Sequence, residues 1–166
     1  AIELKPDYVV ARIERATMGI AAGQFDAAKA DIDAARKVTP NSPSVAYTQA
    51  MLDFTQQKYP AAQESLQKVL RVAPEHLPSI LLAGAVELRL GSLKQADLHV
   101  RKYLAAEPNN AYASKLLAEI QLRSAQPGDA AATLAPLLKQ GTQDPQLLAL
   151  AGQSAMSKRD FGQATE

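Results

Sequence analysis

Proline recurs in this chain at a constant interval of 34 residues, at Pro6, Pro40, Pro74 and Pro108. The residues around these prolines are also similar, reading Leu-Lys-Pro-Asp, Val-Thr-Pro-Asn, Val-Ala-Pro-Glu and Ala-Glu-Pro-Asn. A regular interval of about 20 to 50 residues is typical of repeat proteins, in which one small structural unit is stacked on the next. The chain is therefore predicted to be a linear stack of similar units.

Three other sets of residues keep the same interval. Alanine recurs at Ala28, Ala62, Ala96, Ala130 and Ala164. A small residue recurs at Ala16, Ala50, Gly84, Ala118 and Gly152. A large and mostly apolar residue recurs at Phe25, Tyr59, Leu93, Pro127 and Phe161. Because two helices approach closely only where small residues lie at their crossing, we expect the small positions inside a helix pair and the large ones between units.

Between these positions the apolar residues follow the period of an α-helix. In the third unit they are Ile80, Ala83, Gly84, Val86 and Leu90. Gly91 is expected to end this helix, since glycine readily adopts the positive φ found after a helix C-terminus. A second helix is predicted from about Lys94, and Pro108 ends it because proline cannot continue a helix. Each unit is thus predicted to be two helices joined by tight turns, which makes the chain all-α.

The 34-residue unit with these landmarks resembles the tetratricopeptide repeat, and the resemblance covers the whole chain. It implies an all-α fold, a right-handed superhelical solenoid of antiparallel helix pairs. The full repeats are predicted to be 9–42, 43–76, 77–110 and 111–144. Residues 1–8 are then the tail of a preceding repeat and 145–166 a partial repeat, so that 1–166 is a fragment of a single array.

The sequence departs from the pattern of the family in three respects. The aromatic residue expected near the start of each first helix is replaced by Arg12, Ala46, Ile80 and Ser114. The fourth repeat has Thr142 in place of the proline, and its second helix is expected to stop at Gly141, ahead of Pro145. Pro136 lies inside that helix, where it cannot donate a hydrogen bond to Ala132, and we expect a kink there.

Four stretches resemble, more narrowly, the tetratricopeptide lipoproteins that accompany bacterial exosortase/PEP-CTERM systems. They are residues 75–79, 82–86, 101–113 and 144–152. This resemblance implies an exported protein of the bacterial periplasm or a membrane-anchored one. It would lie beside the machinery for exopolysaccharide and surface-protein sorting.

Composition narrows the kinds of partner. The net charge is +1, and the 18 basic and 17 acidic residues are interspersed, so nothing indicates a nucleic-acid partner. No cysteine is present, which excludes disulfides and thiolate metal sites. No apolar run approaches the ~20 residues that span a bilayer, so this segment is not expected to insert into a membrane. The sequence shows no signal-peptide pattern, and both of its ends are expected to be cut from a longer protein.

Residues with catalytic or metal-binding chemistry are few, so no catalytic site, metal or cofactor is predicted. Neither a glycine-rich phosphate loop nor a G-x-S-x-G motif occurs. The two histidines, His76 and His99, are separated by a whole predicted helix, whereas a metal needs three or four convergent ligands. The carboxylates Asp31 and Asp33 do not face each other on a helix, and both are expected on a solvated outer face.

The resemblance to the repeat family places a partner-binding groove along the first helices. The residues expected to line it are Val10, Ile13, Thr17, Tyr47, Met51, Leu81, Ala85, Arg89, Tyr112, Lys115, Glu119 and Arg123. A tyrosine ring buries area while its hydroxyl bonds, and methionine adapts to irregular partners, so both suit an interface. The largely apolar wall favours an extended or helical apolar peptide. A neighbouring set is expected in the core between helices: Ile20, Phe54, Leu88, Leu122 and Met156.

Repeats that bind the C-termini of chaperones use a lysine at the fifth position and an asparagine at the ninth position of their first repeat. Ile13 and Thr17 occupy those positions here. Lys115 stands at a fifth position, but Glu119 at the ninth would repel a carboxylate. Recognition of a free acidic C-terminus is therefore not expected.

Three functions are compatible with these features. The first is a scaffold or adaptor that holds a protein or peptide in the groove. The second is a structural spacer within a longer solenoid, whose cut ends at Ile2, Leu4 and Ala164 would expose apolar surface and favour end-to-end association. The third is an enzyme, for example one acting on a glycan, for which this segment shows no convergent catalytic residues.

Overall fold

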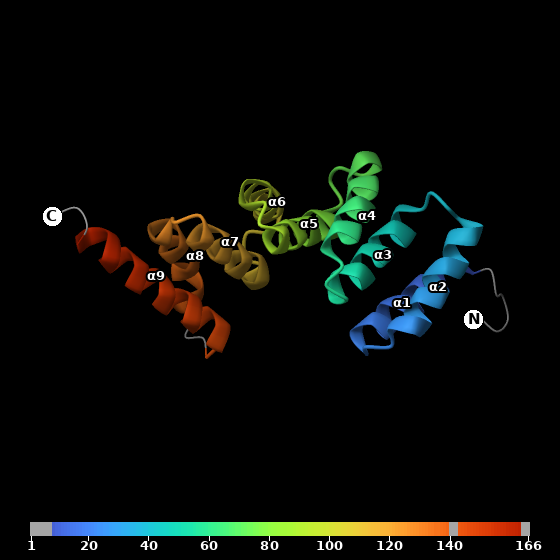
Figure 1. The fold of residues 1–166 in the computed structure, drawn as a ribbon, viewed down its shortest axis with the longest axis horizontal. Coiled ribbons are helices and arrows are strands. Elements are labelled where there is room, and N and C mark those ends of the chain that lie inside the picture. Colours follow the sequence, from blue (N-terminus) through green and yellow to red (C-terminus); the bar gives the residue numbers. More distant parts are fainter. Residues whose placement is uncertain (1–7, 140–142, 164–166) are drawn as a thin grey trace. The chain divides into compact units, whose positions relative to one another are not determined.

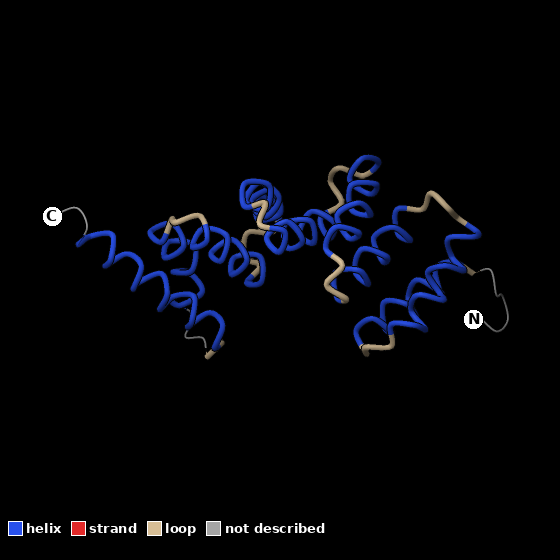
Figure 2. Tube along the Cα trace, in the orientation of Figure 1, coloured by secondary structure: helices blue, strands red, loops and turns tan. Residues whose placement is uncertain are grey.

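The computed structural model describes residues 8–139 and 143–163, and within them the chain forms nine helices and no strand (Figures 1 and 2). They are α1 (Val9–Ala21), α2 (Phe25–Val38), α3 (Pro43–Thr55), α4 (Tyr59–Val72), α5 (Leu77–Leu90), α6 (Leu93–Ala106), α7 (Ala111–Arg123), α8 (Pro127–Lys139) and α9 (Pro145–Gln163). Each predicted full repeat supplies two consecutive helices. The all-α prediction is confirmed.

Two compact units divide the chain, residues 1–90 and residues 91–166. The first contains α1 to α5, and the second contains α6 to α9. In each unit, helices that follow one another in the sequence pack together, as α1 does with α2 and α7 with α8 (Figure 1). The boundary lies between α5 and α6, inside the third predicted repeat. The prediction of one continuous array with the stated repeat boundaries stays a prediction.

The turn inside each helix pair is built around one residue with a positive φ. This residue also recurs every 34 positions, as Gly23 (φ 73°), Gln57 (φ 60°), Gly91 (φ 78°) and Ala125 (φ 57°). The expected role of Gly91 in ending its helix is confirmed. Because only glycine adopts the left-handed conformation without a steric cost, the turns at Gln57 and Ala125 are under backbone strain.

The turn between successive pairs holds the recurring proline. α2, α4 and α6 each end two residues before it, at Pro40, Pro74 and Pro108. The N-cap residue of the next helix lies two residues after the position of the recurring proline. Where the cap is Asn110 or Asp144, its side chain accepts a hydrogen bond of 2.9 Å from a backbone N–H of the first turn. Such a bond satisfies a donor that has no partner within the helix, and it fixes where the helix begins.

The departures of the fourth repeat are partly visible. α8 includes Pro136 and continues beyond it, and the kink at this residue stays a prediction. The stop expected at Gly141 lies outside the described residues, as do Thr142 and Pro6. α9 begins at Pro145, where a missing N–H costs nothing because that group would have no helical partner.

Nearly all of the recurring small residues are buried. The alanines Ala28, Ala62, Ala96 and Ala130 are at most 1% exposed. Of the other small set, Ala16, Ala50, Gly84 and Ala118 are buried, whereas Gly152 is exposed. A Cβ placed on Gly19 of α1 would lie 3.4 Å from the Cβ of Ala28 on α2, which leaves little room for a larger side chain. The large residues Phe25 and Tyr59 pack against the edges of the buried clusters in the first unit.

Candidate functional site

The first helices of the first unit form a continuous layer. α1 contacts α3 and α3 contacts α5, whereas α2 and α4, both fully described, do not contact each other. A stack whose first helices touch while its second helices diverge curves toward the first helices. The α1–α3–α5 layer is therefore the inner side of this unit, and it carries the eight predicted groove residues from Val10 to Arg89.

Tyr47 of α3 bridges two helices of this layer. Its ring meets the ring of His76, the residue before α5, edge to face, with the ring centroids 5.3 Å apart. The Nδ1 atom of His76 lies 2.8 Å from the Oγ atom of the buried Ser79, which fixes the imidazole. The tyrosine ring is thus held firmly between α3 and the start of α5.

The hydroxyl of Tyr47 remains available. Burial raises the pKa of this hydroxyl above its usual value, yet no described residue forms a hydrogen bond with it. No described side chain has a fully buried polar atom without a partner, so the hydroxyl oxygen reaches the surface. Tyr47 therefore combines a fixed, half-buried ring with a polar end that a partner can engage.

Ile13 and Met51 lie at the edge of the core. Both are half-buried and pack against the same apolar cluster, which α1, α2 and α3 share. The hydroxyl of Thr17 donates to the backbone oxygen of Ile13 at 2.9 Å, so its donor is already used. These side chains can offer a partner apolar surface.

The other predicted groove residues of the first unit differ in exposure. Val10 is 53% exposed, Arg89 is exposed and Leu81 is half-buried. Ala85 is only 3% exposed and belongs to the core, contrary to its predicted place in the groove. The physical reason is that α5 is enclosed on several sides, since residues 83–88 are all buried.

In the second unit the four predicted groove residues lie on α7. Tyr112 is 51% exposed, Arg123 is exposed and Glu119 is half-buried. The ammonium of Lys115 donates to the carboxylate of Asp144 at 2.7 Å, and this contact holds the pKa of Asp144 below its usual range. Lys115 is therefore already engaged, which is a second argument against recognition of a free C-terminal carboxylate.

The prediction that a second set of residues lies in the core between helices is correct for only some of them. Ile20 and Leu88 are buried, and Phe54 and Leu122 are half-buried. Met156 of α9 is 71% exposed, so the prediction was wrong for this residue. No helix in the described part of the chain covers this side chain.

Asp31 corrects another sequence-based expectation. Instead of lying on a solvated face, its side chain is 4% exposed and sits between two arginines of α1. Its carboxylate accepts hydrogen bonds from Arg15 at 2.6 Å and from Arg12 at 3.2 Å. The side chain of Asp33 is 39% exposed, so it is partly solvated, and it pairs with Lys29 and Arg36. Spacing along one helix could not show that the neighbouring helix places two guanidinium groups beside Asp31.

The described residues show neither a metal site nor a membrane-spanning helix. No three His, Cys, Asp or Glu side chains converge there as metal ligands. None of the helices in the described part is both long and apolar enough to cross a membrane.

Comparison with known proteins agrees with this architecture. Residues 88–153 match the model of the tetratricopeptide repeat family. The structure is similar to that of YrrB, a tetratricopeptide-repeat protein with an unusual peptide-binding site, with a TM-score of 0.78 at 18% identity over 96% of this chain and 82% of that one. PilF of Pseudomonas aeruginosa gives a TM-score of 0.80 at 18% identity over 99% of this chain and 75% of that one.

A third similar structure contains a ligand. The first tetratricopeptide-repeat domain of Spaghetti, bound to an HSP90 peptide, gives a TM-score of 0.65 at 20% identity over 70% of this chain and 93% of that one. The curated proteins include no match to this sequence. The matching family model describes a repeat and no catalytic family, and the similar structures establish that the chain has the tetratricopeptide-repeat fold.

Proposed function

We propose that this chain, which has the tetratricopeptide-repeat fold, is a scaffold that binds a peptide or protein along the inner layer of its first unit. The observation that carries this proposal is Tyr47, whose ring is fixed between α3 and α5 while its hydroxyl lacks a hydrogen-bond partner among the described residues. A rigid aromatic ring with an available polar end is the kind of residue that contributes most to binding energy at interfaces.

The surroundings of Tyr47 support an apolar ligand with a few polar groups. Ile13, Met51 and Leu81 are half-buried, so each keeps part of its apolar surface accessible. Arg89 supplies a cation on α5. An extended or helical peptide could cover this apolar surface and hydrogen-bond with the hydroxyl of Tyr47. Peptide binding by the Spaghetti domain is consistent with this use of the fold.

A photo-crosslinking experiment tests the proposal. A photoreactive amino acid at Leu81 is expected to capture a partner from an extract of the source cells, and Tyr47→Glu in the same chain should abolish that capture. The matched control carries the photoreactive residue at Val38, an exposed apolar position on α2. Equal capture from both positions would contradict a role for the inner layer. Capture from neither would favour the spacer function.

The narrower resemblance of residues 75–79, 82–86, 101–113 and 144–152 supports a more specific context. We propose that the complete protein is exported to the periplasm or anchored to a membrane, where it serves bacterial exopolysaccharide or PEP-CTERM surface-protein sorting. Fractionation of source cells with an antibody against this chain should recover it with membranes or periplasm. Recovery with cytosolic markers would refute this context while leaving the binding function open.

A further inference from the structure

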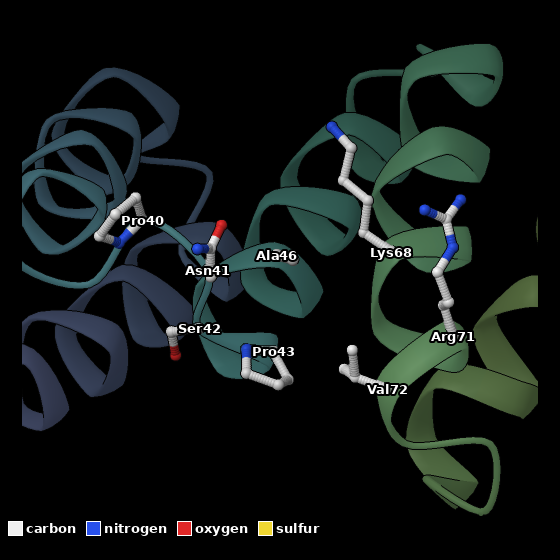
Figure 3. A pocket seen from close by; sticks show the side chains of 8 residues that line it. All are labelled: Pro40, Asn41, Ser42, Pro43, Ala46, Lys68, Arg71 and Val72. Carbon is white, nitrogen blue, oxygen red and sulfur yellow. The ribbon is translucent and has the colours of Figure 1, made fainter.

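The outer side of the first unit contains a furrow between α2 and α4, floored by α3. One part of it is a pocket of about 470 Å³ that Lys29, Arg36, Gln49 and Ser65 help to line. The adjoining pocket, of about 250 Å³, is lined by Asn41, Pro43, Arg71 and Val72 among others (Figure 3). Pro40, Ala46 and Lys68 line both pockets, so they form one continuous depression, which we call the outer furrow.

Positive charge predominates in the outer furrow. Lys29 and Arg36 share a single carboxylate, that of Asp33, at 2.6 and 3.1 Å. Arg36 also donates to the side-chain oxygen of Gln49 at 2.7 Å. Lys68 and Arg71 of α4 make no ion pair or hydrogen bond with any described residue. Two cations are therefore held beside a pocket with their donors available.

Apolar surface lies directly beside these two cations. Val72, the last residue of α4, is 65% exposed and lines one of the two pockets. Figure 3 shows Val72 opposite Pro43, with Lys68 and Arg71 along the α4 side of the pocket. Pro43 is the first residue of α3, so the positive end of a helix dipole also lies at this pocket.

This combination fits one class of ligand better than others. Cations with available donors select carboxylates, and the exposed apolar patch around Val72 favours an apolar side chain beside them. No aromatic residue lines either pocket, so stacking of nucleic-acid bases has no platform here. The chain as a whole has a net charge of only +1, which gives no general attraction for polyanions.

We propose that the outer furrow binds an acidic peptide segment of a partner protein, one that places carboxylates on Lys68 and Arg71 and an apolar side chain against Val72. Sharing of Asp33 leaves Lys29 and Arg36 with residual positive charge, which receives a further acidic residue of the same segment. This site is separate from the inner layer, so the first unit has two surfaces and can join two partners.

Fluorescence anisotropy with a defined probe tests this site. The probe is a fluorescein-labelled, N-acetylated peptide of sequence Glu-Glu-Val-Glu-Glu-Val, titrated with the whole chain at low salt. Lys68→Gln with Arg71→Gln is expected to weaken binding by about tenfold or more, since two charge-assisted contacts are lost. The matched control, Lys37→Gln with Lys58→Gln, removes the same charge outside the furrow and should bind as the unchanged chain does.

Each other outcome is decisive. Absence of probe binding at millimolar protein, or equal weakening by the two double variants, would overturn the proposal and leave Lys68 and Arg71 as solvated charges near the end of α4. Equal binding of a Gln-Gln-Val-Gln-Gln-Val probe would also overturn it. Displacement by tripolyphosphate at lower concentrations than by unlabelled peptide would reassign the site to phosphate. Tyr47→Glu should leave probe affinity unchanged, which separates this test from that of the inner layer.

Discussion

Arg15 of α1 donates two hydrogen bonds to the carboxylate of Asp31 of α2, from its Nε and Nη2 atoms. The Nη2 atom lies 2.6 Å from Oδ1, and the aspartate side chain is only 4% exposed. Arg12, one turn earlier, reaches the same carboxylate. This bidentate ion pair connects the two helices of the first pair. Bidentate pairs between arginine and a carboxylate are stronger than single hydrogen bonds, because two parallel bonds fix both distance and orientation.

Asp31→Asn should destabilise the first helix pair. An amide cannot accept two charge-assisted hydrogen bonds, and the buried site has no other group to replace them. Arg15 is largely exposed and can regain water, so the expected loss is about 1–3 kcal/mol, below that for a fully buried pair. Urea denaturation measures it. Asp33→Asn, at a more exposed position on the same helix, should cost only a few tenths of a kcal/mol.

Acidification should weaken the same contact. The hydrogen bond from Arg15 lowers the pKa of Asp31 in the folded chain. Its stabilising effect is therefore complete above the pKa of an unfolded aspartate, near pH 4, and is lost as pH falls through the lower folded value. Urea denaturation between pH 2 and 6 should show a steeper decline for the unchanged chain than for Asp31→Asn. Parallel declines would contradict this assignment.

Substituting glycine at the strained turn residues should stabilise the chain. Gln57 and Ala125 have the same left-handed backbone as Gly23 and Gly91. Relief of that strain exceeds the entropy that glycine adds to the unfolded state, so Gln57→Gly should gain about 0.5–1 kcal/mol. Gly23→Ala should lose about 1 kcal/mol through the backbone alone, since no neighbouring atom lies within 4 Å of an added Cβ. Thermal melts of the two variants should shift in opposite directions.

Enlarging a recurring alanine should disrupt its helix pair. Ala62 is fully buried among the apolar residues that join α3, α4 and α5. Ala62→Leu forces these helices apart, with an expected cost of about 1–3 kcal/mol in unfolding free energy. Ala61→Leu, at the exposed neighbouring position of the same helix, is the control and should change stability little. Equal stability of the two variants would show that the crossing tolerates large residues.

Alkaline pH should reveal the burial of Tyr47. Its pKa is raised because burial penalises the charged phenolate. The folded chain then holds its proton to higher pH than the unfolded chain does, so stability is full below about pH 10 and declines as pH rises through the folded value. Tyr47→Phe should reduce this decline in urea denaturation measured from pH 9 to 11.5. An unchanged pH dependence would contradict a raised pKa for this hydroxyl.

Local features of the chain were the most predictable from sequence. The stop at Gly91 occurs as predicted, because the backbone preference of glycine acts within a few residues. Ala62 is fully buried, as are the other recurring alanines in the described part of the chain. These properties depend on one residue and its immediate neighbours, and a regular interval repeats them.

Side-chain contacts between separate helices could not be predicted from the spacing of residues in the sequence. The spacing of Asp31 and Asp33 gave no indication that α1 would bury one of them, and nothing near Lys115 identified Asp144 as its partner. Ala85 falls at a groove position of the family, yet its neighbours enclose it. In each case the deciding group lies on another helix.

The sequence by itself determined the helices, their turns and the order of their packing, because helix propensity, glycine and proline geometry and a constant interval act along the chain. Only the tertiary structure decided which side chains remain available to a partner. The accessible hydroxyl of Tyr47 and the available donors of Lys68 and Arg71 depend on how neighbouring helices approach or diverge. Burial and charge pairing are set by distances in space, and these distances follow from the packing of helices rather than from the spacing of residues.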